Sequence, residues 1–417
     1  MDIKEIITSE RIAEIRSARK LNREHSYSAA CSVIGINAVS ELDNLLSLYD
    51  ESIYILFSEL YDHGIGGFYY SVSARDTDGF LPDLESTKQI LNSITTLGLR
   101  DDERLLADLL PTEIANRIVN FTLSLQDSDG YFYHPQWGKQ ITEVRKQKDV
   151  VWANNLIKCF SRTPIYPLPP ERWRKNDNER PKFLLNIDSF KKYLSNIDLS
   201  KTPTNVASQL TVNATQIKNA GAQYVEELKR WLTSWKWLWL WQESENYDSV
   251  NALIRICEVY EIMDIILPYQ EVILEAAIRG IERENAADVL YCDNPWKSIN
   301  GLFKFLRANN AREEIYRLRS RLWRRAENLI RKTRDNVLIF KRNDGGFSYT
   351  PKGSTSMSRG VPVAVPNTCE SDVNATLVAS SSTVNNLCAA LGIPRVEIFC
   401  EEDGDLFFEL LKSKISK

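Results

Sequence analysis

A short motif that recurs along the chain most constrains what this sequence can fold into. Residues 66–71 read GGFYYS, residues 345–350 read GGFSYT, and residues 129–134 carry the looser copy DGYFYH. Self-similarity of this kind is typical of repeat architectures, in which one supersecondary unit is used several times. We therefore expect a fold assembled from related units.

Aspartates downstream of the three copies predict helix starts, because a carboxylate accepts hydrogen bonds from the free backbone N–H groups of a first turn. Its negative charge also complements the positive end of the helix dipole. Two further stretches carry such a start without the glycine motif, and a sixth start is suggested near Ser26. The five aspartates are Asp83, Asp149, Asp248, Asp293 and Asp372. The chain between consecutive starts suffices for a returning helix, so each unit is expected to be a helical hairpin.

Apolar residues recur at three- and four-residue steps through most of the chain, and extended alternating runs are scarce, which predicts an all-α protein. The clearest helical stretches are residues 29–48, 84–97, 114–125, 250–262 and 315–330. Hairpins stacked in line would form a solenoid, and hairpins arranged in a ring would form an α/α toroid. Because the steps between starts are uneven, we expect a toroid of about six hairpins, (α/α)6-like.

The length of 417 residues, with 43% hydrophobic and 26% charged residues, is that of an ordinary globular chain and excludes global disorder. We expect residues 1–417 to form one toroid domain. Within it, residues 161–205 contain six prolines and predict a proline-rich insertion, either a surface excursion or a lid over a site.

Charge and residue counts exclude several classes of function. A net charge of −4 argues against a dedicated nucleic-acid binder. No run approaches the ~18 apolar residues of a membrane-spanning helix, and the charged N-terminal residues do not resemble a signal peptide. Seven scattered cysteines predict reduced thiols in a cytoplasmic protein. With three histidines and no zinc-type spacing, we expect neither a metal nor another cofactor.

The segment QDSDGYF at residues 126–132 resembles the Gln–Gly–aromatic repeat of the terpenoid cyclases and protein prenyltransferases. A second copy, RNDGGF at residues 342–347, has Arg342 where the glutamine would stand. The resemblance covers residues 52–160 and 336–393, and it implies the α/α toroid fold and an isoprenoid cyclase or prenyl-binding function.

The chain departs from both families at their catalytic residues. The cyclase acid motif Asp-x-Asp-Asp is absent, and residues 76–79, which read DTDG, lack its last aspartate. The Asp-x-Cys and distant His that bind zinc in prenyltransferases are also missing. Both chemistries are therefore disfavoured by the residues, although the scaffold is similar.

In a toroid, the helix starts and glycine turns gather at one end of the central cavity, where we expect the site. Glu85 on a first turn, His134 among aromatic residues and the helix-opening Asp372 are the catalytic candidates, as general acids or bases. The alternative is structural: an N-cap for the aspartates and a hydrogen-bonded turn residue for the histidine.

Further residues at the same end are candidates for binding a ligand through ring faces and hydrogen bonds. They are Tyr70, Asp83, Tyr133, Trp137, Trp152, Asn251, Trp296 and Asn374. This mixture suits a small polar molecule or an oligosaccharide, cleaved by hydrolysis or elimination. Core packing is the alternative for the tryptophans. Besides the isoprenoid alternative, a non-enzymatic toroidal binding protein also remains open.

Overall fold

The computed structural model describes residues 6–100, 106–169, 181–199, 202–234, 247–265, 267, 269–283 and 286–415. Helices make up 65% of it and strands 4%, which confirms the all-α class. In these ranges no helix is both long and apolar enough to span a bilayer.

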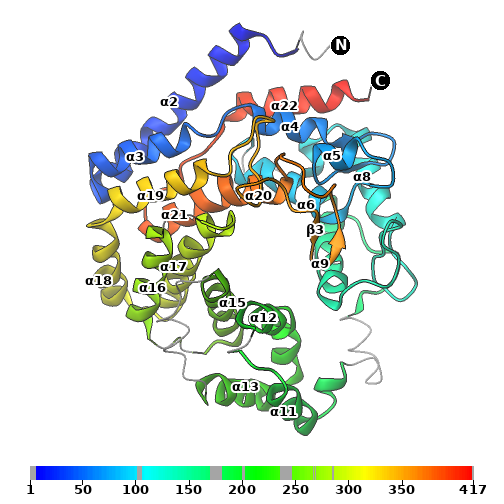
Figure 1. The fold of residues 1–417 in the computed structure, drawn as a ribbon, viewed down its shortest axis with the longest axis vertical. Coiled ribbons are helices and arrows are strands. Elements are labelled where there is room, and N and C mark those ends of the chain that lie inside the picture. The colour runs from blue at the N-terminus through cyan, green and yellow to red at the C-terminus, as the bar shows by residue number, and fades with distance from the viewer. Residues whose placement is uncertain are drawn as a thin grey trace.

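Six helical segments of the described chain follow one another around a central cavity (Figure 1). Each contacts the next, and the last, α20–η3–α21, contacts the first. In chain order they are α6 (Leu84–Thr96), α9 (Glu143–Cys159), α12 (Pro203–Ala220), α15 (Tyr247–Met263), α17 (Leu290–Ala308), and the continuous α20 (Val373–Leu377), η3 (Val378–Ser382) and α21 (Thr383–Leu391).

A second helix precedes each of these inner helices in the chain, and among the described residues only one of these outer helices, through Tyr193, contributes to the cavity wall. These outer helices are α4 (Ser52–Glu59), α8 (Thr112–Ser124), α11 (Ile187–Ser195), α13 (Ala222–Ser234), α16 (Gln270–Glu282) and α19 (Ala326–Leu338). Helix α8 packs on α9, α13 on α12, and α16 on both α15 and α17. The apolar residues between the two layers form one large hydrophobic core.

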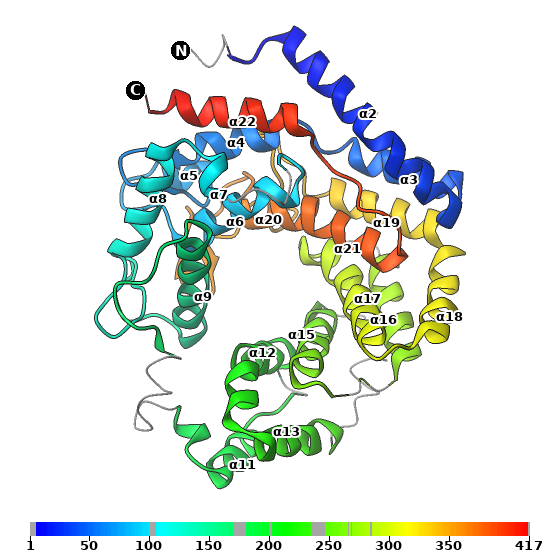
Figure 2. The same ribbon diagram turned by 180° about the vertical axis from the view of Figure 1, so that it is seen from behind.

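The remaining helices pack outside or connect these elements. They are α2 (Ser9–Ile34), α3 (Ile36–Leu46), α5 (Val72–Arg75), α7 (Leu106–Leu109), η2 (Lys182–Leu184), α18 (Arg312–Trp323) and α22 (Glu401–Ser413). Helices α2 and α22 lie together with both chain ends on one side of the molecule (Figure 2).

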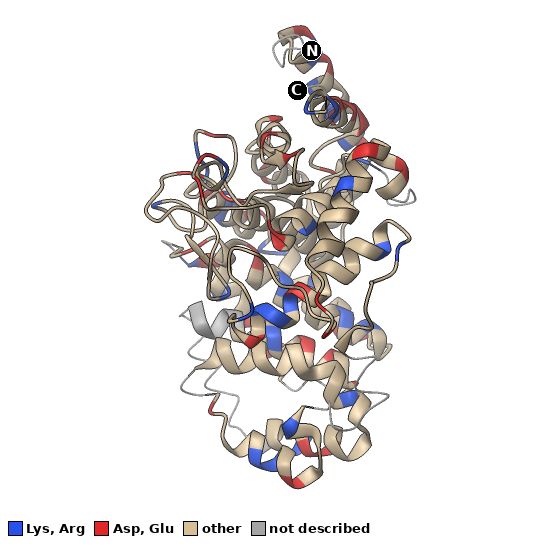
Figure 3. Ribbon diagram, turned by 90° about the vertical axis from the view of Figure 1, so that its right-hand side faces the viewer, with Lys and Arg blue, Asp and Glu red and all other residues tan. Residues whose placement is uncertain are grey.

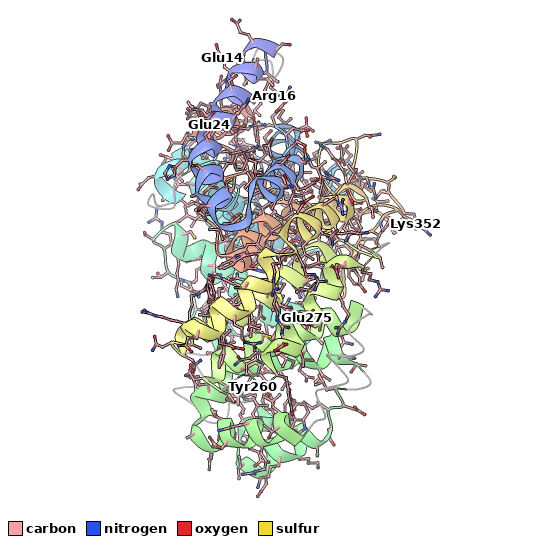
Figure 4. The ribbon with its side chains drawn as sticks, turned by 90° about the vertical axis from the view of Figure 1, so that its left-hand side faces the viewer. Glu14, Arg16, Glu24, Tyr260, Glu275 and Lys352 are labelled. Atoms are coloured by element: carbon pink, nitrogen blue, oxygen red, sulfur yellow. The ribbon has the colours of Figure 1, made fainter. Side chains whose placement is uncertain are left out.

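Charged residues of both signs are interspersed along the outer elements (Figure 3). Glu275 of α16, labelled in Figure 4, illustrates how they pair: its carboxylate lies 3.3 Å from both Arg321 and Arg325. Such half-buried pairs near the surface orient neighbouring helices while contributing little free energy each.

The strands form two short antiparallel ladders. In the first, β1 (Tyr61–Asp62) pairs with β2 (Gly67–Phe68), so that Tyr61 faces Phe68. In the second, β3 (Met357–Ser358) pairs with β4 (Val361–Pro362), and this hairpin reaches the wall of the cavity.

The sequence repeat corresponds to a repeated hydrogen-bond pattern. In the first copy, Asp83 N donates to Phe68 O (3.2 Å) and Phe68 N donates to Thr87 Oγ1 (3.0 Å). In the copy at residues 345–350, Asp372 N donates to Phe347 O (3.0 Å) and Phe347 N donates to Thr376 Oγ1 (3.0 Å). The aromatic residue of each turn is thereby tied to the helix start that follows it.

The two glycines of the motif serve different purposes. The first has a left-handed backbone, with φ of +91° at Gly66 and +97° at Gly345, which costs glycine little. The second is closely packed: a Cβ on Gly67 would lie 2.8 Å from Pro82, and one on Gly346 would lie 2.5 Å from Ser371.

Two of the five aspartates cap a helix as predicted. Asp83 accepts from Glu85 N and Ser86 N at the start of α6, and Asp372 accepts from Ala375 N at the start of α20.

Two other predicted starts are wrong, and two lie in the first turn of a helix without a described cap. Asp149 lies inside α9, which begins at Glu143 behind the cap Thr142, and Ser26 lies inside α2. Asp293 lies in the first turn of α17 without capping it, and the side chain of Asp248 falls outside the described residues. The longest predicted helix, residues 29–48, divides at Gly35 (φ +84°) into α2 and α3.

The sixth inner helix does not begin near Ser26; it is α12, which begins at Pro203. Its proline occupies the first turn, where a missing N–H costs nothing. The proline-rich segment 161–205 therefore contains α11 and the start of α12, although residues 170–180 and 200–201 lie outside the described part.

Candidate functional site in the central cavity

The central cavity has a volume of about 1370 Å³ and is lined by all six inner segments and by the β3–β4 hairpin. Asn and Gln side chains reach it from five of the six segments, together with hydroxyl groups and several charged residues. A wall of this kind offers both hydrogen-bond donors and acceptors to a ligand.

Glu85 is the most extensively held carboxylate on this wall. It lies in the first turn of α6 and is 2% exposed. Its carboxylate accepts from Ser358 Oγ at 2.7 Å and from Asn374 Nδ2 at 3.0 Å. Arg145 Nη1 lies 3.1 Å away, and Arg359 Nε lies 3.7 Å away. Elements distant in the sequence thus converge on one carboxylate.

Arg145 is a residue that the sequence reasoning missed. Its fully buried guanidinium forms ion pairs with Asp83 (3.5 Å), Glu85 (3.1 Å) and Asp149 (3.0 Å). It also lies over the rings of Trp137, at 4.4 Å, and Trp152, at 5.2 Å. The available sequence signal was the four-residue spacing from Arg145 to Asp149 on one helix.

Burial raises the pKa of Asp149 to about 7, against the opposing effect of Arg145. One buried cation therefore does not hold all three neighbouring carboxyl groups fully ionised near neutral pH.

Asp293 on α17 is a second buried carboxyl group on the cavity wall, 3% exposed. It accepts from Ser382 Oγ and Asn386 Nδ2, both at 2.8 Å. Burial raises the pKa of Asp293, and the nearby Lys297 and Arg255 oppose that shift. Ser382 ends the π-helical turn η3, a distortion frequently found at functional sites.

His134 is not placed to act as a general base. Its ring is buried, and Nε2 lies 2.8 Å from Pro82 O. Because a carbonyl oxygen can only accept, Nε2 carries the proton, and Nδ1 accepts from Gln136 N at 3.3 Å. Burial lowers the pKa of His134, so the ring is neutral with both nitrogens occupied. It joins two turns and does not line the cavity.

Asp372 is also buried behind the cavity wall. Its carboxylate accepts from Ala375 N at 2.8 Å and Tyr349 N at 3.2 Å, and burial raises its pKa to about 7. Tyr70 lies beside it and does line the cavity. The position of Asp372 supports the structural alternative, an N-cap.

The ligand-binding candidates divide into two groups. Tyr70 and Asn374 line the cavity, as does Glu85. Asn251 lies on α15, but its side chain is outside the described residues.

The other candidates are turned away from the cavity. Trp296 is fully buried and donates to Thr333 Oγ1 at 2.9 Å. Tyr133 donates to Asp129 at 2.7 Å, while Trp137 donates to Pro362 O at 2.8 Å. Asp83 and Trp152 are buried around Arg145. Large rings stabilise the fold most where they are covered, which accounts for the placement of Trp296 and Trp152.

Comparison with known proteins finds no matching family model, no matching curated protein and no matching solved structure. Within the described ranges, no group of three or more His, Cys, Asp and Glu side chains is arranged to hold a metal ion.

Proposed function

We propose that this chain is an α/α toroid enzyme that binds a carbohydrate-like ligand in its central cavity and hydrolyses it with Glu85 and Asp293. The order of the inner helices around the cavity supports the toroid, since each contacts the next and the last contacts the first. Asn and Gln side chains on five of the six segments support a hydroxylated ligand.

The observation that carries the proposal is that two buried carboxyl groups on one cavity wall have different surroundings. Glu85 is ion-paired with Arg145. Asp293 instead contacts a hydroxyl and an amide, and its pKa is raised by burial. Two carboxyl groups in contrasting environments are the arrangement that glycoside hydrolysis uses.

The roles follow from these surroundings. Asp293, whose pKa is raised by burial, is the general acid that protonates the leaving oxygen. Glu85, which is ion-paired with Arg145, is the base or nucleophile. Both side chains are anchored to the same continuous segment, Glu85 by Asn374 of α20 and Asp293 by Ser382 and Asn386. That segment fixes the position of one carboxyl group relative to the other.

The isoprenoid alternative is less consistent with this wall. A hydrocarbon chain would leave polar groups without partners, at about 1–3 kcal/mol for each one buried and unsatisfied.

The test is turnover of a panel of oligosaccharides, with thermal stabilisation by the same panel and by prenyl diphosphates. We expect saccharide turnover that falls by about 100-fold or more in Glu85→Gln and in Asp293→Asn. Glu327→Gln, at an exposed carboxylate on the outer helix α19, is the control and should retain activity. Stabilisation by prenyl diphosphates alone, without saccharide turnover, would favour the isoprenoid alternative.

A further inference from the structure

Basic side chains gather along one part of the cavity wall. Arg255 of α15, Lys297 of α17 and Arg359 of the β3–β4 turn all line the cavity. A fourth, Lys148 of α9, is not among the lining residues but directly follows Gln147, which is, and its charge is repelled by each of the three. These four residues, from four separate elements, are here called the basic cluster.

Three carboxylates, Glu258, Glu85 and Asp293, face the four cations of this cluster, and Lys297 and Arg255 act on the last of them. Glu258 lies 3.0 Å from Arg255 and 3.9 Å from Lys297, so it is shared between them. Arg359 lies 3.7 Å from Glu85, which Arg145 already pairs at 3.1 Å. Among the described residues, Lys148 has no carboxylate within ion-pair distance.

Lys148 shows the electrostatic cost of this arrangement. It is half-buried, and desolvation together with its basic neighbours lowers its pKa to about 8, with Glu258 as the opposing charge. Such mutual repulsion is retained at a cost in stability, and a bound anion would relieve it.

The cluster also has members near each of the two carboxyl groups of the proposed reaction. Arg359 is the neighbour of Glu85, while Lys297 and Arg255 act on Asp293. An anionic group held by the cluster would therefore belong to a molecule that reaches both carboxyl groups.

We propose that Arg255, Lys297 and Arg359, which line the cavity, form a subsite for an anionic group, a carboxylate or a phosphate, on the ligand of the central cavity, and that Lys148 adds to its positive potential. Guanidinium forks and ammonium groups recognise both kinds of oxyanion through charge-assisted hydrogen bonds. This inference rests on the proposed function, and it narrows the substrate to a saccharide that carries a uronate or a phosphate ester.

Binding is measured by calorimetry on the full chain with a glucuronate-containing disaccharide, its neutral glucose counterpart and inorganic phosphate. We expect the anionic probes to bind, and the neutral disaccharide to bind more weakly. Lys148→Gln, Arg255→Gln and Lys297→Gln should each weaken anion binding about tenfold or more. Lys158→Gln, at an exposed position of the same helix α9, is the control.

Lys148→Gln supplies a second readout that a merely structural lysine would not give. Because the substitution removes repulsion, the ligand-free variant should melt at a higher temperature than the wild type while binding the anion more weakly. Uronate affinity of the wild type should also fall as the pH rises from 7 to 9 and Lys148 loses its proton, whereas the variant should not show this fall.

The outcomes separate the two proposals. Preference for the uronate identifies an acidic saccharide, and binding of phosphate alone identifies a phosphate ester. Turnover of neutral saccharides with no preference for either anion would overturn the subsite and leave the proposed function standing. Anion binding that the cluster variants weaken, without cleavage of any saccharide, would support the subsite and contradict the proposed hydrolysis.

Discussion

Arg145 places a single cation among three carboxyl groups in a space from which water is excluded. Removing one member of such a buried set leaves uncompensated charge, which costs about 3–5 kcal/mol. We expect Arg145→Met to lower the free energy of unfolding by roughly that amount, measured by denaturant titration.

The control for this substitution is Arg317→Met. Arg317 pairs with Glu314 and Glu271 at the exposed surface, where ion pairs contribute little. A loss of stability in Arg317→Met as large as that in Arg145→Met would contradict the importance assigned to the buried cluster.

Asp288 gives a prediction about pH. Its carboxylate accepts from Leu290 N at 2.9 Å, and burial raises its pKa to about 7, above the ~3.9 of an unfolded chain. Between these two values the folded protein binds a proton that the unfolded chain does not, so this group's contribution to stability falls as pH rises towards 7. Above pH 7 the destabilisation is complete.

Asp288→Asn keeps an oxygen acceptor and removes the charge. We expect the variant to melt at a higher temperature than the wild type at pH 8, and the difference to shrink at pH 5. Differential scanning calorimetry at the two pH values measures this. Equal melting temperatures at pH 8 would show that the buried charge is not destabilising.

Single residues were predictable from the sequence where their role is local. Asp83 and Asp372 cap helices through atoms two or three residues away, and Glu85 follows directly from the first of these starts. His134 and Trp296 were not predictable, because packing between distant segments determines which way their rings face. Arg145 was missed because two of its three carboxylate partners lie about 60 residues away.

At the level of elements, the glycine turn that precedes α20 ties one inner helix to its neighbours. A Cβ on Gly346 would lie 2.7 Å from Thr376 Oγ1, the atom that accepts from Phe347 N. We expect Gly346→Ala to destabilise the protein by about 1–3 kcal/mol through overpacking, measured by thermal and denaturant unfolding.

Gly301→Ala is the matched substitution. Gly301 lies inside α17, where an added Cβ would meet only Cys257 at 3.7 Å, an ordinary contact. Removing a glycine from a helix interior should stabilise the protein by about 0.5–1 kcal/mol. If both substitutions destabilise equally, the close packing of the repeated turn is not what makes Gly346 necessary.

The elements found most accurately from the sequence were those with a clear apolar period, such as α6, α8 and α15. Helix α12 was missed because its first residue, Pro203, belongs to a stretch whose other prolines do interrupt helices. The β3–β4 hairpin gave no signal, since each strand has only two residues, yet it supplies Ser358 and Arg359 to the site.

At the scale of the whole molecule, the repeats predict how many related units to expect, but they do not determine how the units close. In the proposed toroid, closure depends on contacts such as that between α9 and α12, which lie on either side of the proline-rich segment. The six inner segments all contribute to the wall of one cavity, a space that their side chains do not fill.

The central claim is that a polar ligand binds in this cavity between Glu85 and Asp293. The most direct measurement is a crystal structure of the Glu85→Gln variant soaked with the oligosaccharide that the wild type cleaves fastest. We predict electron density for the sugar in the central cavity, with its scissile oxygen within hydrogen-bond distance of Asp293. Density for the sugar only on the outer surface, with the cavity unoccupied, would contradict the claim.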